Sequence, residues 1–215
     1  MASPATATNG SGTGTIQCRY NYVEAWQWLQ QKGRETFGNG FLLHEEDKAP
    51  ILLLLCWFLR DEIAAPQLGI SLQKGILLTG PVGCGKTALM KLMQYITQQP
   101  FIIKPCRDIA FEFMDEGFST ILKYSRGLSG QPRVFCFDDL GVESSLKYYG
   151  NECNVLAEVL LSRYDLFIAH GLLTHITTNL SAGEIEQAYG NRIRSRMREQ
   201  FNLVAFDKEA VDKRR

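Results

Sequence analysis

Short apolar runs alternate with longer helical stretches from residue 75 to the end of the chain. Each run has the length of a buried strand, and each stretch between two runs is long enough for a helix. Apolar strands that alternate with helices are typical of a parallel sheet, because helices cover both faces of such a sheet. The pattern therefore predicts an α/β fold. The predicted strands are 75–80, 101–105, 133–139, 172–179 and 203–206, and the predicted helices are 86–98, 107–125, 151–168 and 181–199.

The residues before position 70 show a different pattern. Residues 1–15 are rich in Ala, Thr, Ser and Gly and carry too little apolar surface to order themselves, so we expect a disordered tail. One helix is predicted over 21–37 and a second over 47–63, where a leucine-rich run ends before Pro66. We expect three parts, which are the tail over 1–15, N-terminal helices packed on the core over 16–69, and the domain with the sheet over 70–215.

The composition is that of an ordinary globular protein. The 215 residues are 45% hydrophobic, which is enough for one well-buried domain. The 23 Lys and Arg residues balance 23 Asp and Glu residues, although residues 191–215 carry eight basic residues against four acidic ones. This excess is too small to indicate nucleic-acid binding by itself.

The cysteines and the apolar runs indicate in which cellular compartment the protein is expected. The six cysteines form no C-x-x-C pair, and no histidine is spaced as a metal ligand, which is typical of a protein in a reducing cytoplasm. The N-terminus has neither the basic start nor the apolar core of a signal peptide. The longest apolar run, 51–59, is about half of a ~20-residue membrane span. We expect a cytoplasmic protein that does not enter a membrane, with Cys56, Cys106 and Cys136 as core residues.

The segment after the first predicted strand carries a phosphate-binding motif. Residues 80–87, GPVGCGKT, match G-x-x-x-x-G-K-[ST] between an apolar strand and a helix. The glycines allow a tight turn whose N–H groups surround a phosphate, and the helix N-terminus adds its positive dipole. Lys86 can then reach the β- and γ-phosphates of ATP, and the Thr87 hydroxyl can bind Mg²⁺. The predicted nucleotide-binding residues are Gly80, Pro81, Val82, Gly83, Cys84, Gly85, Lys86, Thr87 and Ala88.

Polar residues end two further predicted strands. The third strand ends in Asp138 and Asp139, at the edge of the sheet where ligands bind in such folds. Asp138 would hold Mg²⁺ through its water shell, and Asp139 would orient or deprotonate the attacking water. The fourth strand ends in Asn179, whose amide can hydrogen-bond that water or the γ-phosphate. Turns also favour Asp and Asn, but beside a phosphate loop these residues predict a nucleoside triphosphatase site.

Four segments occur in the order GPVGCGKT, VFCFDDLGVE, THITTNLS and GNRIRSRM, and they resemble the AAA+ ATPases of the helicase-loader and transposition-helper group (DnaC/IstB-like). The resemblance covers about residues 70–206. It implies a three-layer P-loop NTPase fold with a five-stranded parallel sheet in the order 5-1-4-3-2 and no C-terminal helical lid. It also implies an ATPase that binds ATP and Mg²⁺ and works as a homo-oligomer. The partners that it implies are a replicative helicase or a transposase, and single-stranded or double-stranded DNA.

The resemblance assigns roles to individual residues. Lys86 and Thr87 correspond to the Walker A residues, Asp138 and Asp139 to Walker B, and Asn179 to sensor 1. Many AAA+ proteins have Glu at the position of Asp139. The shorter side chain predicts slow hydrolysis, which suits a switch more than a motor.

An arginine stands at every second position from 192 to 198. Positions four apart share a helix face, so Arg192 and Arg196 face one way, while Arg194 and Arg198 face the other. This geometry disfavours a single DNA-binding patch. Arg192 and Arg196 lie in the box VII region of the resemblance, where the arginine finger is found, and Arg192 is expected to bind nucleotide. We expect Arg196 to reach the ATP site of a neighbouring subunit.

Two other functions share these motifs. An ATP-gated DNA-binding adaptor would bind nucleotide, assemble on DNA and recruit a partner with little turnover. A small P-loop kinase would also need the phosphate loop, but the acid pair Asp138–Asp139 and the strand end at Asn179 disfavour a kinase.

Overall fold

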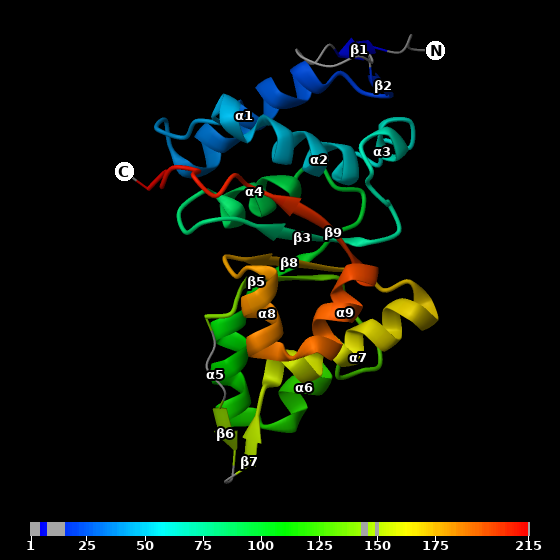
Figure 1. The fold of residues 1–215 in the computed structure, drawn as a ribbon, viewed down its shortest axis with the longest axis vertical. Helices are drawn as coiled ribbons and strands as arrows, with labels where there is room; N and C mark the ends of the chain where they lie inside the picture. Colours follow the sequence, from blue (N-terminus) through cyan, green and yellow to red (C-terminus); the bar gives the residue numbers. More distant parts are fainter. Residues whose placement is uncertain (1–4, 8–15, 143–145, 149–150, 215) are drawn as a thin grey trace. The chain divides into compact units, whose positions relative to one another are not determined.

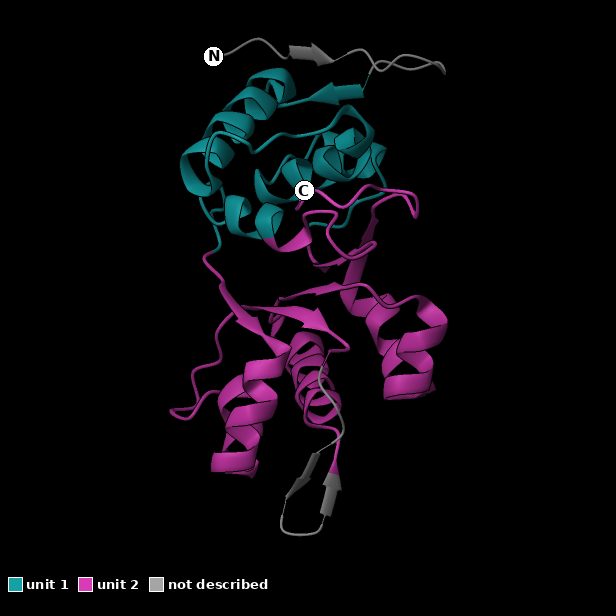
Figure 2. Cartoon of the chain, turned by 90° about the vertical axis from the view of Figure 1, so that its left-hand side faces the viewer, with its two compact units in different colours: residues 1–72, 88–99 teal, residues 73–87, 100–215 magenta. Residues whose placement is uncertain are grey.

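The computed structural model describes residues 5–7, 16–142, 146–148 and 151–214. The chain forms two units, which Figure 2 shows in different colours. The first unit comprises residues 1–72 and 88–99, and the second comprises residues 73–87 and 100–215.

The first unit is built mainly from helices. Strands β1 (Ala5–Ala7) and β2 (Ile16–Cys18) pair in antiparallel orientation, and the rest of the predicted tail lies outside the described residues. The helix predicted over 21–37 is confirmed as α1 (Tyr22–Phe37). It begins there because the Asn21 side chain accepts hydrogen bonds from the first free backbone N–H groups of the helix.

The helix predicted over 47–63 is wrong in its length. A 3-10 turn, η1 (Glu45–Asp47), leads into α2 (Lys48–Phe58), which ends before Arg60, where φ is 58°. The buried carboxylate of Asp61 accepts hydrogen bonds from the N–H groups of Ile63 and Ala64, at 3.1 and 3.0 Å. These bonds start a new helix, α3 (Ala64–Gln67), so Pro66 lies inside a short helix instead of beyond a long one.

The second unit contains the predicted five-stranded parallel sheet (Figure 1). All five predicted strands are present, with ends shifted by a few residues, and every neighbouring pair is parallel. Their spatial order is β4-β5-β8-β3-β9, which is the order 5-1-4-3-2 when it is read from β9 and numbered along the chain. The strands are β3 (Gly75–Thr79), β4 (Ile102–Pro105), β5 (Phe135–Leu140), β8 (Thr174–Thr178) and β9 (Phe201–Ala205).

Two of the predicted helices are each divided in the structure. The stretch 107–125 forms α5 (Cys106–Glu116) and α6 (Phe118–Ser125), and 181–199 forms α8 (Ala182–Tyr189) and α9 (Asn191–Gln200). Gly117 and Gly190 separate the halves with φ of 61° and 83°. A helix cannot continue through such an angle, and glycine adopts it without steric cost. The helix predicted over 86–98 is shorter, α4 (Lys86–Met93).

The start of the predicted helix 151–168 is also wrong. Residues Asn151–Cys153 form β7, which pairs in antiparallel orientation with β6 (Leu146–Tyr148), and neither strand was predicted. Helix α7 (Val155–His170) begins after Asn154, whose side chain accepts a hydrogen bond from the N–H of Ala157 at 3.1 Å.

Helices α5, α7, α8 and α9 lie on one side of the sheet (Figure 1). Apolar side chains from these helices and from β5 and β8 form the core of the second unit and are almost completely buried. The core fixes the strands, and thereby the polar residues at their carboxyl ends. Cys56, Cys106 and Cys136 are buried, as predicted. None of the described helices combines the length and the apolar character needed to cross a bilayer.

A fully buried arginine closes the amino end of the sheet. Arg163 of α7 donates to acceptors beside the starts of β5 and β8 and at the end of α6, and its guanidinium lies 5.5 Å from the ring centres of Phe135 and Phe137. Burial lowers the pKa of Arg163 to about 9, so it remains charged at neutral pH. Its acceptors are the Thr174 hydroxyl at 2.8 Å and the carbonyl oxygens of Tyr124, Ser125, Arg133 and Leu173 at 2.9, 3.4, 3.0 and 2.9 Å.

Candidate nucleotide-binding site

The phosphate loop lies between β3 and α4, and the predicted nucleotide-binding residues stand in sequence along it. Gly83 and Gly85 have φ of 84° and 99°, angles that other residues rarely adopt. The side chain of Lys86 is folded back over the loop, where its ammonium donates to the carbonyl oxygens of Gly80 and Pro81 at 2.8 Å each. The Lys86 ammonium therefore lies beside the carbonyl groups at the start of the loop.

The two predicted metal-binding residues lie in direct contact. The Thr87 hydroxyl donates to the carboxylate of Asp138, with both oxygens at 3.0 Å. Asp138 ends the apolar part of β5 and is only 6% exposed. A hydroxyl oxygen and a nearly buried carboxylate are hard oxygen ligands of the kind that Mg²⁺ prefers. The residues present thus fit a magnesium ion at this edge of the sheet.

Thr177 of β8 is a site residue that the sequence interpretation missed. Its hydroxyl donates to Oδ1 of Asp138 at 2.6 Å and accepts a hydrogen bond from the N–H of Asp139 at 2.9 Å. One side chain therefore fixes both acidic residues. The sequence spacing could have indicated Thr177, because it stands two positions before the predicted site residue Asn179, and alternate residues of a strand share a face.

Asp139 lies in an irregular part of β5. The register of β5 against β8 shifts between Phe137 and Leu140, and Asp139 has a φ of 57°. Such a bulge breaks the alternation of the strand and re-aims a side chain, and bulges of this kind often occur at active sites. Asp139 is half-buried.

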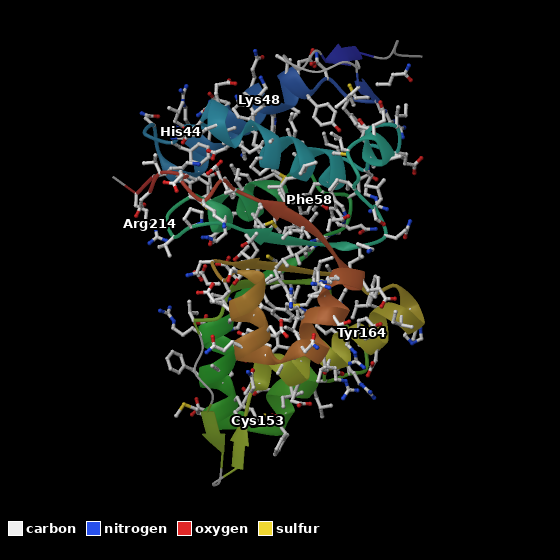
Figure 3. The ribbon with its side chains drawn as sticks, in the orientation of Figure 1. His44, Lys48, Phe58, Cys153, Tyr164 and Arg214 are labelled. Carbon is white, nitrogen blue, oxygen red and sulfur yellow. The ribbon has the colours of Figure 1, made fainter. Side chains whose placement is uncertain are left out.

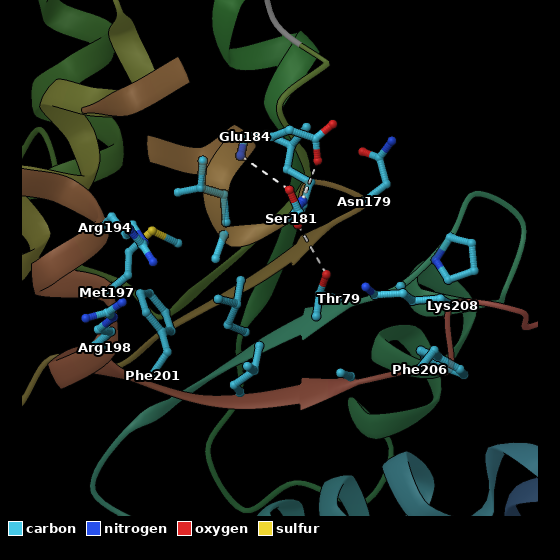
Figure 4. Close-up of a pocket in the computed structure, with 18 residues that line it drawn as sticks. Thr79, Asn179, Ser181, Glu184, Arg194, Met197, Arg198, Phe201, Phe206 and Lys208 are labelled. Atoms are coloured by element: carbon cyan, nitrogen blue, oxygen red, sulfur yellow. Dashed lines mark hydrogen bonds between the residues drawn. The ribbon is translucent and has the colours of Figure 1, made fainter. Parts of the chain in front are cut away.

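Asn179 follows β8 and is exposed at the rim of a pocket of about 760 Å³ (Figure 4). Gly80 and Pro81 of the phosphate loop line the same pocket, so the structure brings Asn179 close to the loop. The side chain of Ser181 accepts a hydrogen bond from the N–H of Glu184 and starts α8 directly after the strand. This cap fixes the position at which Asn179 leaves the sheet.

The arginines of α9 divide between two faces, as predicted. Arg194 and Arg198 line the pocket (Figure 4), and Arg194 forms an ion pair with Glu186. Arg196 lies against α7 instead, with its guanidinium 4.6 Å from the ring centre of Tyr164 and 4.0 Å from Asp165. Figure 3 labels Tyr164 on that helix. The arginine predicted to act on a neighbour is thus not one of those that line the pocket beside the loop.

Arg192 is exposed near the start of α9. No side-chain partner of Arg192 is seen among the described residues. Its predicted role in binding nucleotide stays a prediction.

Comparison with known sequences places the chain among ATPases. The sequence model of the "ATPase family associated with various cellular activities (AAA)" matches residues 76–203, which is more than half of the chain. Over 131 residues, or 57% of the chain, the sequence is 29% identical to the cell division control protein 48 homolog B of Arabidopsis thaliana. The match covers only 22% of that relative.

Comparison with solved structures agrees with the predicted fold class. The DnaC helicase loader is similar with a TM-score of 0.55 and 19% identity, over 84% of this chain and 99% of that one. The replication initiator DnaA bound to AMPPCP and single-stranded DNA is similar with a TM-score of 0.53 and 15% identity, over 79% of this chain and 49% of that one. At such identities the similarity is one of fold.

Proposed function

The chain belongs to the AAA family of ATPases, and we propose that it binds ATP with Mg²⁺ and hydrolyses the nucleotide slowly at the phosphate loop. The observation that carries the proposal is the hydrogen-bonded group of Thr87, Asp138 and Thr177 beside the loop. A glycine loop alone can bind many phosphates. A nearly buried carboxylate next to the loop hydroxyl adds the ligands for the metal ion that accompanies a nucleoside triphosphate.

The residues divide the work of hydrolysis. Lys86 leaves the carbonyl oxygens of its own loop and donates to the β- and γ-phosphates. Thr87 and Asp138 would hold Mg²⁺, which neutralises charge on those phosphates when it is bound. Asp139 accepts a hydrogen bond from the attacking water and orients it, and Asn179 donates to the water or to the γ-phosphate.

Slow turnover follows from the length of Asp139. A carboxylate in the bulge of β5 with one methylene fewer than Glu reaches less far towards the water. General-base catalysis depends strongly on that hydrogen-bond distance. We therefore propose that bound ATP persists long enough to act as a switch.

The test of nucleotide binding uses Lys86→Ala. The variant loses the ammonium that meets the β- and γ-phosphates, so we expect the Kd for ATP to rise about a hundredfold. Isothermal titration calorimetry in Mg²⁺ measures it, and phosphate release measures turnover. Arg107→Ala removes one charge from an exposed position on α5 and serves as the matched control. Unchanged affinity in Lys86→Ala would overturn the assignment of the site.

At the level of biological role, we propose a helper of DNA replication or transposition that works as a homo-oligomer. The similarity in fold to the DnaC helicase loader supports a helicase as the partner, and the family resemblance adds a transposase as the alternative. The similarity in fold to DnaA bound to single-stranded DNA supports contact with DNA. Co-purification of the chain with a candidate helicase, in ATP and in ADP, tests the partner.

The oligomer is tested by mixing two inactive variants. Arg196→Ala lacks the proposed arginine finger and Lys86→Ala lacks the loop cation. In mixed oligomers an intact Arg196 meets an intact loop at some interfaces, so phosphate release should partly return, because such a finger contributes about 10³ or more in rate. If mixed oligomers form and remain inactive, Arg196 does not act on a neighbour.

A second candidate, an ATP-gated adaptor with little turnover, is favoured by the same short side chain of Asp139. Phosphate release with and without single-stranded DNA separates the two functions. An adaptor would bind ATP tightly and show no stimulation of release.

A further inference from the structure

The segment that follows β9 returns to the phosphate loop. Strand β9 runs parallel to β3, and after it the N–H of Phe206 donates to the carbonyl oxygen of Thr79 at 2.9 Å. Seven residues later the N–H of Lys213 donates to the carbonyl oxygen of Gly83 at 3.1 Å. The Lys213 ammonium donates to the carbonyl oxygen of Cys84 at 3.0 Å. One residue thus contacts two successive carbonyl groups of the loop.

This return is held by local contacts. The carboxylates of Asp207 and Asp212 accept hydrogen bonds from the N–H groups two residues later, at 2.9 and 3.0 Å, which fixes two turns. The Lys213 ammonium also lies 5.2 Å from the ring centre of Phe206, a cation–π contact. The approach to the loop is close, since a Cβ on Gly83 would lie 2.1 Å from Oδ1 of Asp212.

The carbonyl groups of the loop have a direct bearing on phosphate binding. A phosphate loop binds its ligand when successive N–H groups point inward, and each carbonyl group of the same peptides then points outward. Fixing a carbonyl group fixes the N–H group on the other side of that peptide bond. Lys86 holds the carbonyl groups of Gly80 and Pro81, and Lys213 holds those of Gly83 and Cys84.

The two lysines differ in whether they would keep their carbonyl acceptors when ATP binds. In the proposed complex with ATP, Lys86 would exchange these carbonyl acceptors for phosphate oxygens. Lys213 contacts carbonyl groups, which lie on the opposite side of each peptide from its N–H group, so it can keep its acceptors while the nucleotide is bound. The second half of the loop contains Gly83 and Gly85, the residues with the most backbone freedom to lose on binding.

We propose that Lys213 is a positioning residue that holds the Gly83 and Cys84 peptides in the orientation that binds the β-phosphate. The inference rests on the proposed function, because it assigns a role in nucleotide binding to this loop. Lys213 acts through the loop and does not touch the nucleotide. Replacement of Lys213 should therefore weaken the binding of ADP and of ATP equally and leave kcat unchanged.

The experiment compares Lys213→Ala, Lys213→Arg and the control Arg107→Ala. Calorimetry measures Kd for ADP and for ATP, and phosphate release gives KM and kcat. We expect Lys213→Ala to raise both Kd values and KM about tenfold, the size of a hydrogen bond made by a charged group. Lys213→Arg retains a donor for Cys84 and should stay within about threefold of wild type. Melting of the nucleotide-free variants should change by less than about 2 °C.

Three results would overturn the inference. Unchanged Kd values would mean that the contact is only packing. Weaker binding of ATP with unchanged binding of ADP would mean that Lys213 reaches the γ-phosphate itself. A loss of kcat with unchanged KM would place Lys213 in the chemical step.

A separate measurement keeps this inference distinct from the proposed function. Hydrogen exchange of the loop amides 83–86 in nucleotide-free protein should be faster in Lys213→Ala than in Arg107→Ala, because the Lys213 ammonium no longer holds the carbonyl group of Cys84. If the wild-type protein binds no nucleotide, the proposed function fails, and this exchange still tests the structural role. Equal exchange in the two variants would overturn that role.

Discussion

The two ends of the parallel sheet use polar residues in different ways. At the amino end, Arg163 is fully buried and donates chiefly to backbone carbonyl groups next to regular elements. At the carboxyl end, Asp138 is held by the hydroxyls of Thr87 and Thr177, and Lys86 is held by a glycine loop. Carbonyl groups packed beside strands cannot change partners without unfolding, whereas hydroxyls and loop peptides can. A polar cluster can therefore serve as a ligand site when its partners are exchangeable.

The largest effect is expected at the amino end. Arg163→Met leaves four carbonyl groups without their donor in the core, so we expect a loss of about 4 kcal/mol in the free energy of unfolding. Urea denaturation followed by circular dichroism measures it. Arg163→Lys keeps the charge and loses the planar fork, so its loss should be intermediate. A loss below about 1 kcal/mol in Arg163→Met would break the comparison.

At the carboxyl end, Asp138→Asn should affect turnover and leave the fold intact. The amide still accepts from both threonines, but the charge that would hold Mg²⁺ is gone, so we expect phosphate release to fall about a hundredfold. The free energy of unfolding should stay within about 0.5 kcal/mol of wild type, or rise, because a nearly buried charge is removed. If Asp138→Asn destabilises the protein as much as Arg163→Met, the polar residues at both ends of the sheet serve mainly to stabilise the fold.

The amino end should also respond to pH through His175 of β8, whose Nδ1 accepts a hydrogen bond from the N–H of Ile76 at 3.2 Å. Burial, with the nearby charge of Arg163, lowers the pKa of His175 from 6.5 to about 3. The unfolded chain takes up a proton below pH 6.5, which the folded chain does not. Stability should therefore decrease as pH falls from about 6.5 towards 3, by about 2 kcal/mol at pH 5.

Urea denaturation at pH 7 and pH 5 measures this effect of pH. His175→Asn can still accept from Ile76 and cannot titrate, so it should lose this part of the pH dependence. An equal slope in wild type and His175→Asn would assign the effect to other groups.

The smallest effect is expected for two neighbouring threonines of β8. Thr177 and Thr178 are both buried, but the Thr178 hydroxyl donates to the carbonyl oxygen of Leu140 at 2.7 Å instead of to an acid. Valine at either position should cost about 1 kcal/mol in stability. Only Thr177→Val should reduce phosphate release, by about fivefold, since it frees Asp138 and Asp139. Equal rates in the two variants would mean that Thr177 is structural as well.

The sequence predicted the parts of the fold that depend on local pattern. The five apolar strands and the phosphate loop are continuous in sequence, and the strand order came from the family resemblance. The helix breaks at Gly117 and Gly190 were missed because glycine is tolerated inside helices, and only the backbone angle shows that these two end one. The end of α2 depended on Asp61, whose carboxylate caps the next helix.

In the candidate site, the residues that belong to motifs could be predicted from the sequence, and their roles stay predictions. Thr177 and Lys213 act through partners that are distant along the chain, Asp138 and the loop carbonyl groups. Arg163 carries no pattern at all, since an arginine in a helix is ordinarily solvated. Apart from the spacing between Thr177 and Asn179, contacts of this kind depend on tertiary packing, which spacing along the sequence does not encode.

The position of β3 between β8 and β9 has a consequence for the order in which the protein is made. The strand that leads into the phosphate loop pairs with partners that leave the ribosome much later, and its contact with His175 spans 99 residues. A nascent chain that has not yet reached Phe201 already contains the complete loop motif, without the sheet that holds it. A nascent chain should therefore begin to bind nucleotide only after β9 has been synthesised. Until then, β3 has an unpaired edge that can pair with other chains.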